Sequence, residues 1–152
     1  MEWGPNTPED TREFLDRVIC QQQEIPRKHY SLAVEARDQG PVGTMALFGI
    51  TAEESGEAEL GYTFNAQHWG QGYATEGALT IMDFGFGQLG LHKIYAKCVT
   101  EHSQSAHVME KSGMQREGCF REHRLVHGEW KDYYFYAIID HEWHKQRKDS
   151  VG

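Results

Sequence analysis

The sequence lacks any apolar run long enough to cross a membrane, and no signal-peptide pattern opens it. Cysteine is scarce: Cys20, Cys98 and Cys119 are odd in number and show no metal-ligand spacing. Basic residues are also few, since 15 Lys and Arg stand against 23 Asp and Glu, for a formal net charge of -8. These absences argue against a membrane or a nucleic acid as partner, and they favour a reduced, cytoplasmic setting.

Two nucleotide-binding motifs are absent from the glycine-rich stretch at 67–77. No Gly-Lys-Ser/Thr follows its glycines, so the stretch is not a nucleotide P-loop. The G-x-G-x-x-G spacing fails at Thr75, and no acidic residue follows at the distance that would hold a ribose. What remains is a turn with Gly70 and Gly72, between a strand-like run at 59–65 and an apolar-periodic run at 75–89.

A glycine-rich turn that joins a strand to a helix presents unpaired backbone N–H groups at the helix N-terminus. Together with the positive end of the helix dipole, these donors form a site for phosphate. Gly70 and Gly72 have no Cβ, so they can adopt unusual backbone angles and let an anion approach closely. The alternative is a tight loop that binds no ligand, because short glycine motifs are common.

The length of 152 residues predicts one domain, residues 1–152, and hydrophobic periodicity predicts a mixed α/β (α+β) sheet. Thr7 caps a first helix, Pro8 opens it, and Pro26 marks its end. The polar tail at 141–152 is expected to fray. The remaining elements are predicted, in chain order, as strands at 29–36, 42–50 and 57–65, a helix at 75–89, a strand at 92–100, a helix at 103–112 ended by Gly113, and a hairpin of strands at 114–125 and 132–139.

Several segments follow one family's order and spacing. Trp69–Ala74 falls on the pattern Arg/Gln-x-x-Gly-x-Gly/Ala, with Trp69 in place of Arg or Gln. Other matching segments are Glu59–Tyr62, Ser105 with 108–114, and Glu117–Gly118 with Gly128, Asp132 and Tyr136. In these segments the chain resembles the GCN5-related N-acetyltransferases (GNAT superfamily), in particular the RimJ/RimL type. The resemblance implies a GNAT-like mixed sheet with a splayed parallel strand pair and flanking helices. It also implies transfer of an acetyl group from acetyl-coenzyme A to a primary amine by direct attack, without a metal.

The resemblance assigns cofactor contacts to the strand before the glycine turn, the turn itself and the start of the next helix. His102 stands where the family usually has an Asn that hydrogen-bonds the pantetheine arm; His can still make one such bond. A backbone N–H on the strand is expected to stabilise the thioester oxygen. The cofactor-binding candidates are Tyr62, Thr63, Phe64, Trp69, Gly70, Gln71, Gly72, Tyr73, Ala74, Thr75 and His102.

Two residues are the catalytic candidates. Glu59 is the first candidate for the base that deprotonates the amine, because the resemblance places it close to the splay; the alternative is a strand glutamate that only holds neighbouring backbone. Glu122 and His123 on the hairpin are second candidates. Ser105 is the candidate proton donor to the leaving thiolate, the alternative being a helix cap or packing residue, and Tyr136 is a weaker candidate for this role.

The acceptor is a peptide N-terminal amine, a small amine or an amino-sugar-like compound, and its specificity is expected to lie in loops at 52–57, 101–104 and 123–131. Family members normally carry a further strand and helix before the segment that begins at Met1. Their absence predicts an exposed sheet edge that pairs with another chain, hence a homodimer. The alternatives are a coenzyme A-binding module without turnover and a partner-binding domain whose glycine turn holds nothing.

Overall fold

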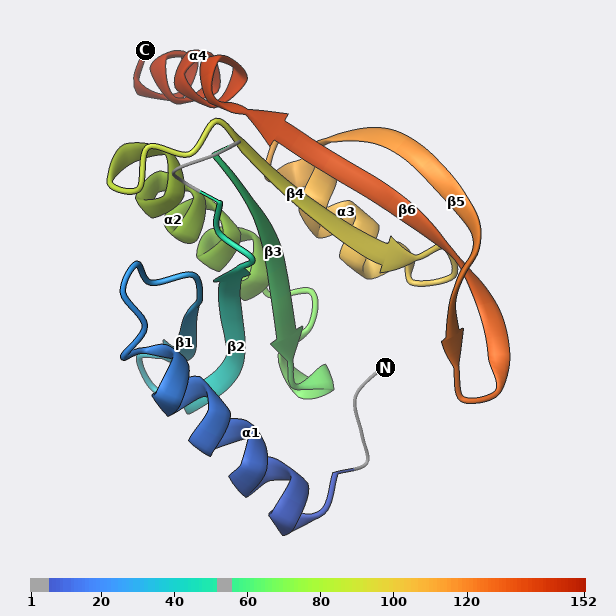
Figure 1. The fold of residues 1–152 in the computed structure, drawn as a ribbon. Coiled ribbons are helices and arrows are strands. Elements are labelled where there is room, and N and C mark those ends of the chain that lie inside the picture. Colours follow the sequence, from blue (N-terminus) through green and yellow to red (C-terminus); the bar gives the residue numbers. More distant parts are fainter. Residues whose placement is uncertain (1–5, 52–55) are drawn as a thin grey trace.

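The computed structural model describes residues 6–51 and 56–152; the part of the predicted acceptor loop at 52–55 lies outside them. A six-stranded sheet carries α2 and α3 on one face, while α1 lies before the other face (Figure 1). The elements are α1 (Pro8–Gln21), β1 (Tyr30–Ala36), β2 (Gly40–Phe48), β3 (Glu57–Phe64), the short 3-10 turn η1 (Ala66–His68), α2 (Tyr73–Gly87), β4 (Lys93–Val99), α3 (Ser103–Lys111), β5 (Gln115–Val126), β6 (Glu129–Ile139) and α4 (Asp140–Val151).

The sheet has the strand order β1-β2-β3-β4-β6-β5, so β1 and β5 form its two edges. Every neighbouring pair is antiparallel except β3 and β4, which run parallel and are joined through α2. This arrangement confirms the mixed sheet predicted from the sequence. Among the described residues, the only other link between strands that carries an α-helix is the one from β4 through α3 to β5.

The parallel pair comes apart soon after it begins. Its register contains three pairs, which end at Glu59 and Tyr95. Beyond this point β3 continues to Phe64 and β4 to Val99 without pairing with each other. The splayed strand pair that the resemblance implies is therefore present, and we call the space between the two diverging strands the fork.

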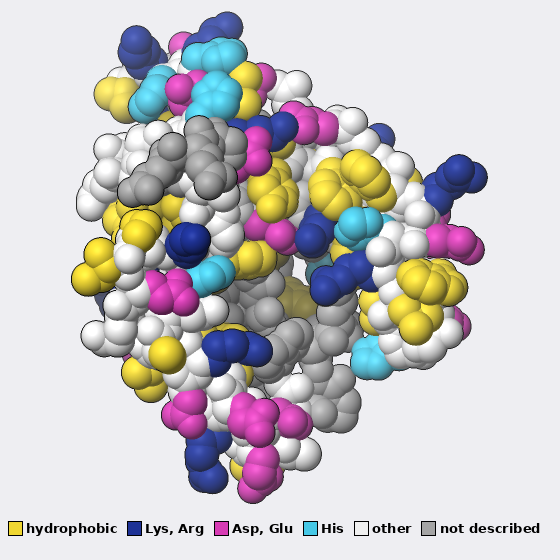
Figure 2. Space-filling view, in the orientation of Figure 1, with side chains coloured by type: hydrophobic (Ala, Val, Ile, Leu, Met, Phe, Trp, Pro, Cys, Tyr) yellow, Lys and Arg dark blue, Asp and Glu magenta, His cyan; other side chains and the backbone are white. Residues whose placement is uncertain are grey.

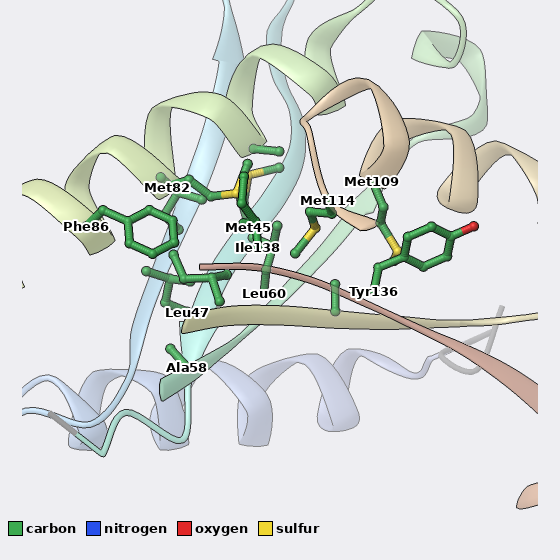
Figure 3. Close-up of a cluster of buried hydrophobic side chains, with 14 of the residues drawn as sticks. Met45, Leu47, Ala58, Leu60, Met82, Phe86, Met109, Met114, Tyr136 and Ile138 are labelled. Carbon is green, nitrogen blue, oxygen red and sulfur yellow. The ribbon is translucent and has the colours of Figure 1, made fainter. Parts of the chain in front are cut away.

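The core lies between the sheet and α2. Strand alternation turns Leu60 and Ile94 toward the helix, where both are buried together with Met82 and Phe86 of α2. Figure 3 shows Leu60, Met82 and Phe86 in this core. The helix sits close to the sheet because Gly85 has no side chain: a Cβ there would lie 2.8 Å from Cδ1 of Ile94. This close packing fixes α2 against β3 and β4, and so fixes the N-terminus of α2 beside the fork.

The C-terminal segment differs from the prediction. Residues 140–151 form α4 and do not fray. Trp143 is only 2% exposed, and its ring stacks on Phe86 of α2 at a centroid distance of 5.6 Å. Arg147 forms an ion pair with Asp83 of α2. The polar composition of this segment hid the helix, because a single large aromatic side chain supplies most of its buried surface.

At the other end of the chain, α1 begins as predicted. Thr7 and Asp10 form a capping box, with the Asp10 N–H donating to Thr7 Oγ1 at 3.1 Å and the Thr7 N–H donating to Asp10 Oδ2 at 2.8 Å. No residue of α1 is buried, and Leu15 and Ile19 are 50% and 57% exposed. None of the helices in the described part of the chain has the length and apolar character of a membrane span.

Candidate active site

The N-terminus of α2 opens without a side-chain cap. Gly72 occupies the N-cap position in the left-handed region, with φ 87°, and Gly70 has φ 73°. The first N–H that bonds within the helix belongs to Glu76, which donates to the Gly72 carbonyl at 2.9 Å. Among the described residues, no protein acceptor takes the backbone N–H groups of residues 71–75. Five consecutive donors are therefore available at one helix end.

The space in front of these donors is open. A Cβ built at Gly70 or at Gly72 would meet nothing within 4 Å. The two glycines are thus required by their backbone angles and not by close protein packing. Consecutive N–H groups around left-handed residues form a concave anion site, which the helix dipole reinforces. This geometry fits a phosphate or pyrophosphate.

The fork presents backbone groups of alternate residues. Asn65 donates its N–H to Val42 of the β2 side at 3.0 Å, so Thr63, two residues earlier, also directs its backbone groups toward β2. The backbone groups of Tyr62 and Phe64 then point the other way, into the fork. Within the described chain, the N–H groups of Tyr62 and Phe64 have no protein acceptor. Thr63 can contact a ligand in the fork only through its exposed side chain.

Trp69 ties the glycine turn to both sides of the fork. Its indole Nε1 donates to the Phe64 carbonyl at 3.0 Å, and its ring lies edge-on to His102 at 5.8 Å between centroids. Its backbone N–H donates to the Ala66 carbonyl at 3.3 Å. Both donors of Trp69 are used within the protein, so its ring surface is what remains for a ligand.

Tyr62 and Ser105 meet across the fork. The Tyr62 hydroxyl lies 2.9 Å from the Ser105 carbonyl, to which it donates, and 2.9 Å from Ser105 Oγ. Burial raises the pKa of Tyr62 well above its usual value, and burial also raises the pKa of Cys98, which contacts Ser105, to about 11. Both groups therefore keep their protons at neutral pH. The result is a protonated hydroxyl and thiol cluster at the start of α3.

Glu59 lies where the two strands part. It is the last residue of β3 that pairs with β4, and its Oε1 lies 3.2 Å from Nζ of Lys97. The Glu59 side chain is 14% exposed and the Lys97 side chain 23%. The pair lies on the sheet face opposite α2, because both residues alternate with the buried Leu60 and Ile94, which face that helix. Figure 2 shows basic and histidine side chains on this side of the molecule. Sequence reasoning missed Lys97, although it alternates along β4 onto the face that Glu59 occupies.

Residues 1–115 match the family described as Acetyltransferase (GNAT) domain. The chain belongs to this family. A relative named an uncharacterized N-acetyltransferase, YnaD of Bacillus subtilis, is 43% identical over 92% of this chain and 78% of its own length. A second relative of the same description, p20 of Bacillus licheniformis, is 32% identical over 87% of this chain and 73% of its own length. The chain is thus a GNAT N-acetyltransferase, and its acyl donor is acetyl-coenzyme A.

Solved structures of GNAT proteins share this fold. The acetyltransferase (GNAT family) from Bacillus anthracis is 32% identical and superimposes with a TM-score of 0.76, over 93% of this chain and 80% of that one. A spermidine N-acetyltransferase from Vibrio cholerae, solved in complex with CoA and spermine, superimposes with a TM-score of 0.79 over 94% and 82%. Its identity of 22% establishes a common fold only.

In this GNAT chain His102 caps α3. Its Nδ1 accepts the N–H of Ser105 at 3.2 Å, and burial lowers its pKa from the usual value. The ring is therefore neutral at pH 7, and because Nδ1 accepts, the proton resides on Nε2. The Nε2–H of the exposed His102 ring is thus a donor that the cap of α3 does not use.

We expect His102→Ala to lower the free energy of unfolding by about 1 kcal/mol, because the α3 cap is lost, and His102→Asn to restore it. The lowered pKa adds a pH dependence, since unfolded His binds protons more readily than the folded ring. The folded protein therefore has its full stability above about pH 6.5, the usual pKa of an unfolded histidine, and loses part of it as the pH falls below that value. Urea unfolding at pH 7.5 and pH 5.5 should therefore show the parent protein losing stability relative to His102→Asn. A difference between the two proteins that does not change with pH would contradict this role.

The remaining candidates lie on the hairpin formed by β5 and β6. Tyr136 donates its hydroxyl to Glu110 Oε1 at 2.9 Å, and its pKa is raised to about 12, chiefly by burial. Its proton is thus committed to a carboxylate of α3. Glu122 is exposed and has a positive φ of 48°, while His123 joins a group of aromatic rings on β5 and β6.

Proposed function

We propose that this enzyme transfers the acetyl group of acetyl-coenzyme A to a primary amine, of a small molecule or a peptide N-terminus, by direct attack in the fork. In this proposal the N–H groups of residues 71–75 bind the pyrophosphate, and the backbone of Tyr62 and Phe64 pairs with the amide-bearing arm. The Nε2–H donor of His102 contacts the same arm. The observation that carries the proposal is the divergence of β3 and β4, which leaves two unpaired backbone donors beside an uncapped helix N-terminus.

The chemistry follows from the groups around the fork. Glu59 removes a proton from the acceptor ammonium, directly or through water, so that a neutral amine attacks the thioester carbonyl. The Tyr62 N–H stabilises the negative charge that develops on the carbonyl oxygen. The C–S bond then breaks, and Ser105 supplies a proton to the leaving thiolate. Cys98 is no candidate for an acyl-cysteine route, because its raised pKa keeps it a thiol.

Thiol release measured with acetyl-coenzyme A and a panel of primary amines and short peptides tests this proposal. We expect free thiol to appear with at least one amine and not with its N-acetylated form. Calorimetry with acetyl-coenzyme A separates binding from turnover. Tight binding without thiol release from any amine would reject the proposed reaction, and no binding at all would reject the proposed cofactor site.

We expect Tyr62→Phe to lower kcat about 10-fold while the KM for acetyl-coenzyme A changes little, as for a group that assists proton transfer. The proton of the phenol is engaged within the protein, because the Tyr62 hydroxyl donates to the Ser105 carbonyl. Its hydroxyl instead fixes Ser105, since it lies 2.9 Å from both the carbonyl and Oγ of that residue. Steady-state kinetics with a saturating amine measures the effect.

Two variants control this prediction. Ser105→Ala should cause a similar loss, and the double variant should lose little more, because both residues act through one proton. Tyr136→Phe removes another buried hydroxyl, which bonds to Glu110 and not to Ser105. A larger fall in kcat for Tyr136→Phe than for Tyr62→Phe would transfer the proton-donating role to Tyr136.

We also propose that the protein works in the cytoplasm as a homodimer. Support comes from β1, an edge strand on which Leu32 is 50% exposed. An unpaired strand edge with apolar side chains favours association with a second chain. Sedimentation of the purified protein tests the proposal, and a monomer at micromolar concentration would reject it.

A further inference from the structure

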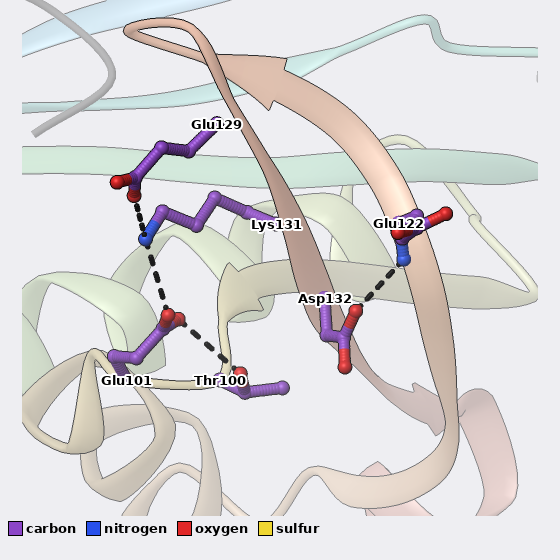
Figure 4. Close-up of polar contacts among 6 residues, drawn as sticks. All are labelled: Thr100, Glu101, Glu122, Glu129, Lys131 and Asp132. Carbon is purple, nitrogen blue, oxygen red and sulfur yellow. Dashed lines mark hydrogen bonds and ion pairs between the residues drawn. The ribbon is translucent and has the colours of Figure 1, made fainter.

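A bulge interrupts β5 beside the fork. Phe120 pairs with Tyr133 and Arg124 pairs with Lys131, so residues 121–123 stand opposite the single residue Asp132. At the centre of the bulge Glu122 has φ 48°, which is unfavourable for a residue with a side chain, and its N–H donates to Asp132 Oδ1 at 2.8 Å (Figure 4). Bulges of this kind re-aim side chains and are frequent next to active sites.

The side chain that the bulge places is His123. Its ring lies 5.8 Å from Phe120, 5.3 Å from Tyr133 and 5.1 Å from Phe135, measured between centroids, and Phe120 and Phe135 lie 4.1 Å apart. We call these four residues the hairpin aromatic cluster. His123 is exposed and Phe120 is 49% exposed, so these two rings face solvent, whereas Tyr133 is buried. Beneath them the buried hydroxyl of Tyr133 has no hydrogen-bond partner among the described residues.

The cluster continues to the candidate catalytic glutamate. Phe135 pairs with Lys97 across β6 and β4, which places both side chains on one sheet face, and Nζ of Lys97 lies 5.9 Å from the Phe135 centroid. The same Nζ lies 3.2 Å from Glu59. When the amine group of an acceptor approaches Glu59 on this face, the remainder of the acceptor molecule therefore lies beside the hairpin aromatic cluster.

We propose that the hairpin aromatic cluster binds the non-reacting part of the acceptor, and that this part is an uncharged aromatic ring. The inference deepens the proposed function and rests on it. Exposed rings at these distances accept a further ring in an offset or edge-on arrangement. A cation-π contact with a second ammonium group is disfavoured at Phe135, because the Lys97 ammonium already lies near the face of that ring. The acceptor class is therefore an arylalkyl monoamine and not a polyamine.

Initial rates with 2-phenylethylamine, tyramine, putrescine and spermidine test this inference in the full-length protein. We expect kcat/KM to be at least about 10-fold higher for the two arylalkylamines than for the two polyamines, because one well-packed aromatic ring contributes about this much to binding. Faster acetylation of spermidine would overturn the inference and leave the proposed function intact. No thiol release with any amine would reject both.

Variants of one residue separate ring binding from folding. His123→Ala should lower kcat/KM for 2-phenylethylamine about 10-fold and leave the KM for acetyl-coenzyme A unchanged, whereas His123→Phe should keep most of the activity because it keeps a ring. Leu125→Ala is the matched control, since Leu125 is 59% exposed on the same strand and pairs with Trp130 outside the cluster. Equal effects of His123→Ala on 2-phenylethylamine and on a non-aromatic monoamine such as butylamine would overturn the inference.

Discussion

Gly72→Val should reduce the affinity for acetyl-coenzyme A by about 100-fold or more, which is close to 3 kcal/mol of binding free energy. Gly72 is held at φ 87°, where a β-branched residue is strained, and the nearby N–H groups of residues 71–75 depend on this angle for their common direction. A valine would also project into the open space that a diphosphate must enter. Isothermal calorimetry with acetyl-coenzyme A measures the loss.

Gly90→Val is the matched control for this variant. Gly90 also has a positive φ, of 64°, also meets nothing within 4 Å when a Cβ is built, and follows the far end of the same helix. Both variants should lose about 1–3 kcal/mol of folding stability from backbone strain. Only Gly72→Val should lose affinity. Unchanged binding by a folded Gly72→Val protein would show that the pyrophosphate does not lie at this turn.

The main-chain part of the site could be predicted because it depends on local sequence. Two glycines between a strand and an apolar-periodic helix dictate a turn with positive φ and free N–H groups, whatever the rest of the fold does. Gly113 is predictable for the same reason, and it ends α3 with φ 90°.

The side-chain part of the site could not be predicted, because it depends on register between distant segments. Glu59 meets Lys97 only because β3 and β4 pair for three residues and stop at Tyr95. Tyr62 meets Ser105 only because the strands then diverge and bring α3 across the gap. Neither of these side-chain contacts can be inferred from a single sequence. The helix α4 was missed for a different reason, since its packing depends on one tryptophan and not on a repeating apolar stripe.

Glu59→Gln should lower kcat by about 100-fold or more at pH 7, which is the usual contribution of a general base. The substitution keeps the size of the side chain and leaves the fork donors in place, so the KM for acetyl-coenzyme A should change little. Acceptor amines become neutral without help as the pH rises toward their own pKa, near 10 for an alkyl amine. The defect should therefore shrink about 10-fold for each pH unit between 7 and 9, as the fraction of neutral amine grows.

The competing view holds that Glu59 only anchors Lys97, and two variants distinguish it from catalysis. Glu57→Gln changes a partly buried carboxylate on the same strand face, at a position still paired with β4, and should leave kcat within about 3-fold of the parent if only the fork glutamate acts as the base. Lys97→Met removes the same ion pair from the other partner, so its unfolding free energy should fall as much as that of Glu59→Gln, by about 1 kcal/mol or less. A pH-independent defect in Glu59→Gln, matched in size by Lys97→Met, would assign Glu59 to structure and move the search for the base to the hairpin.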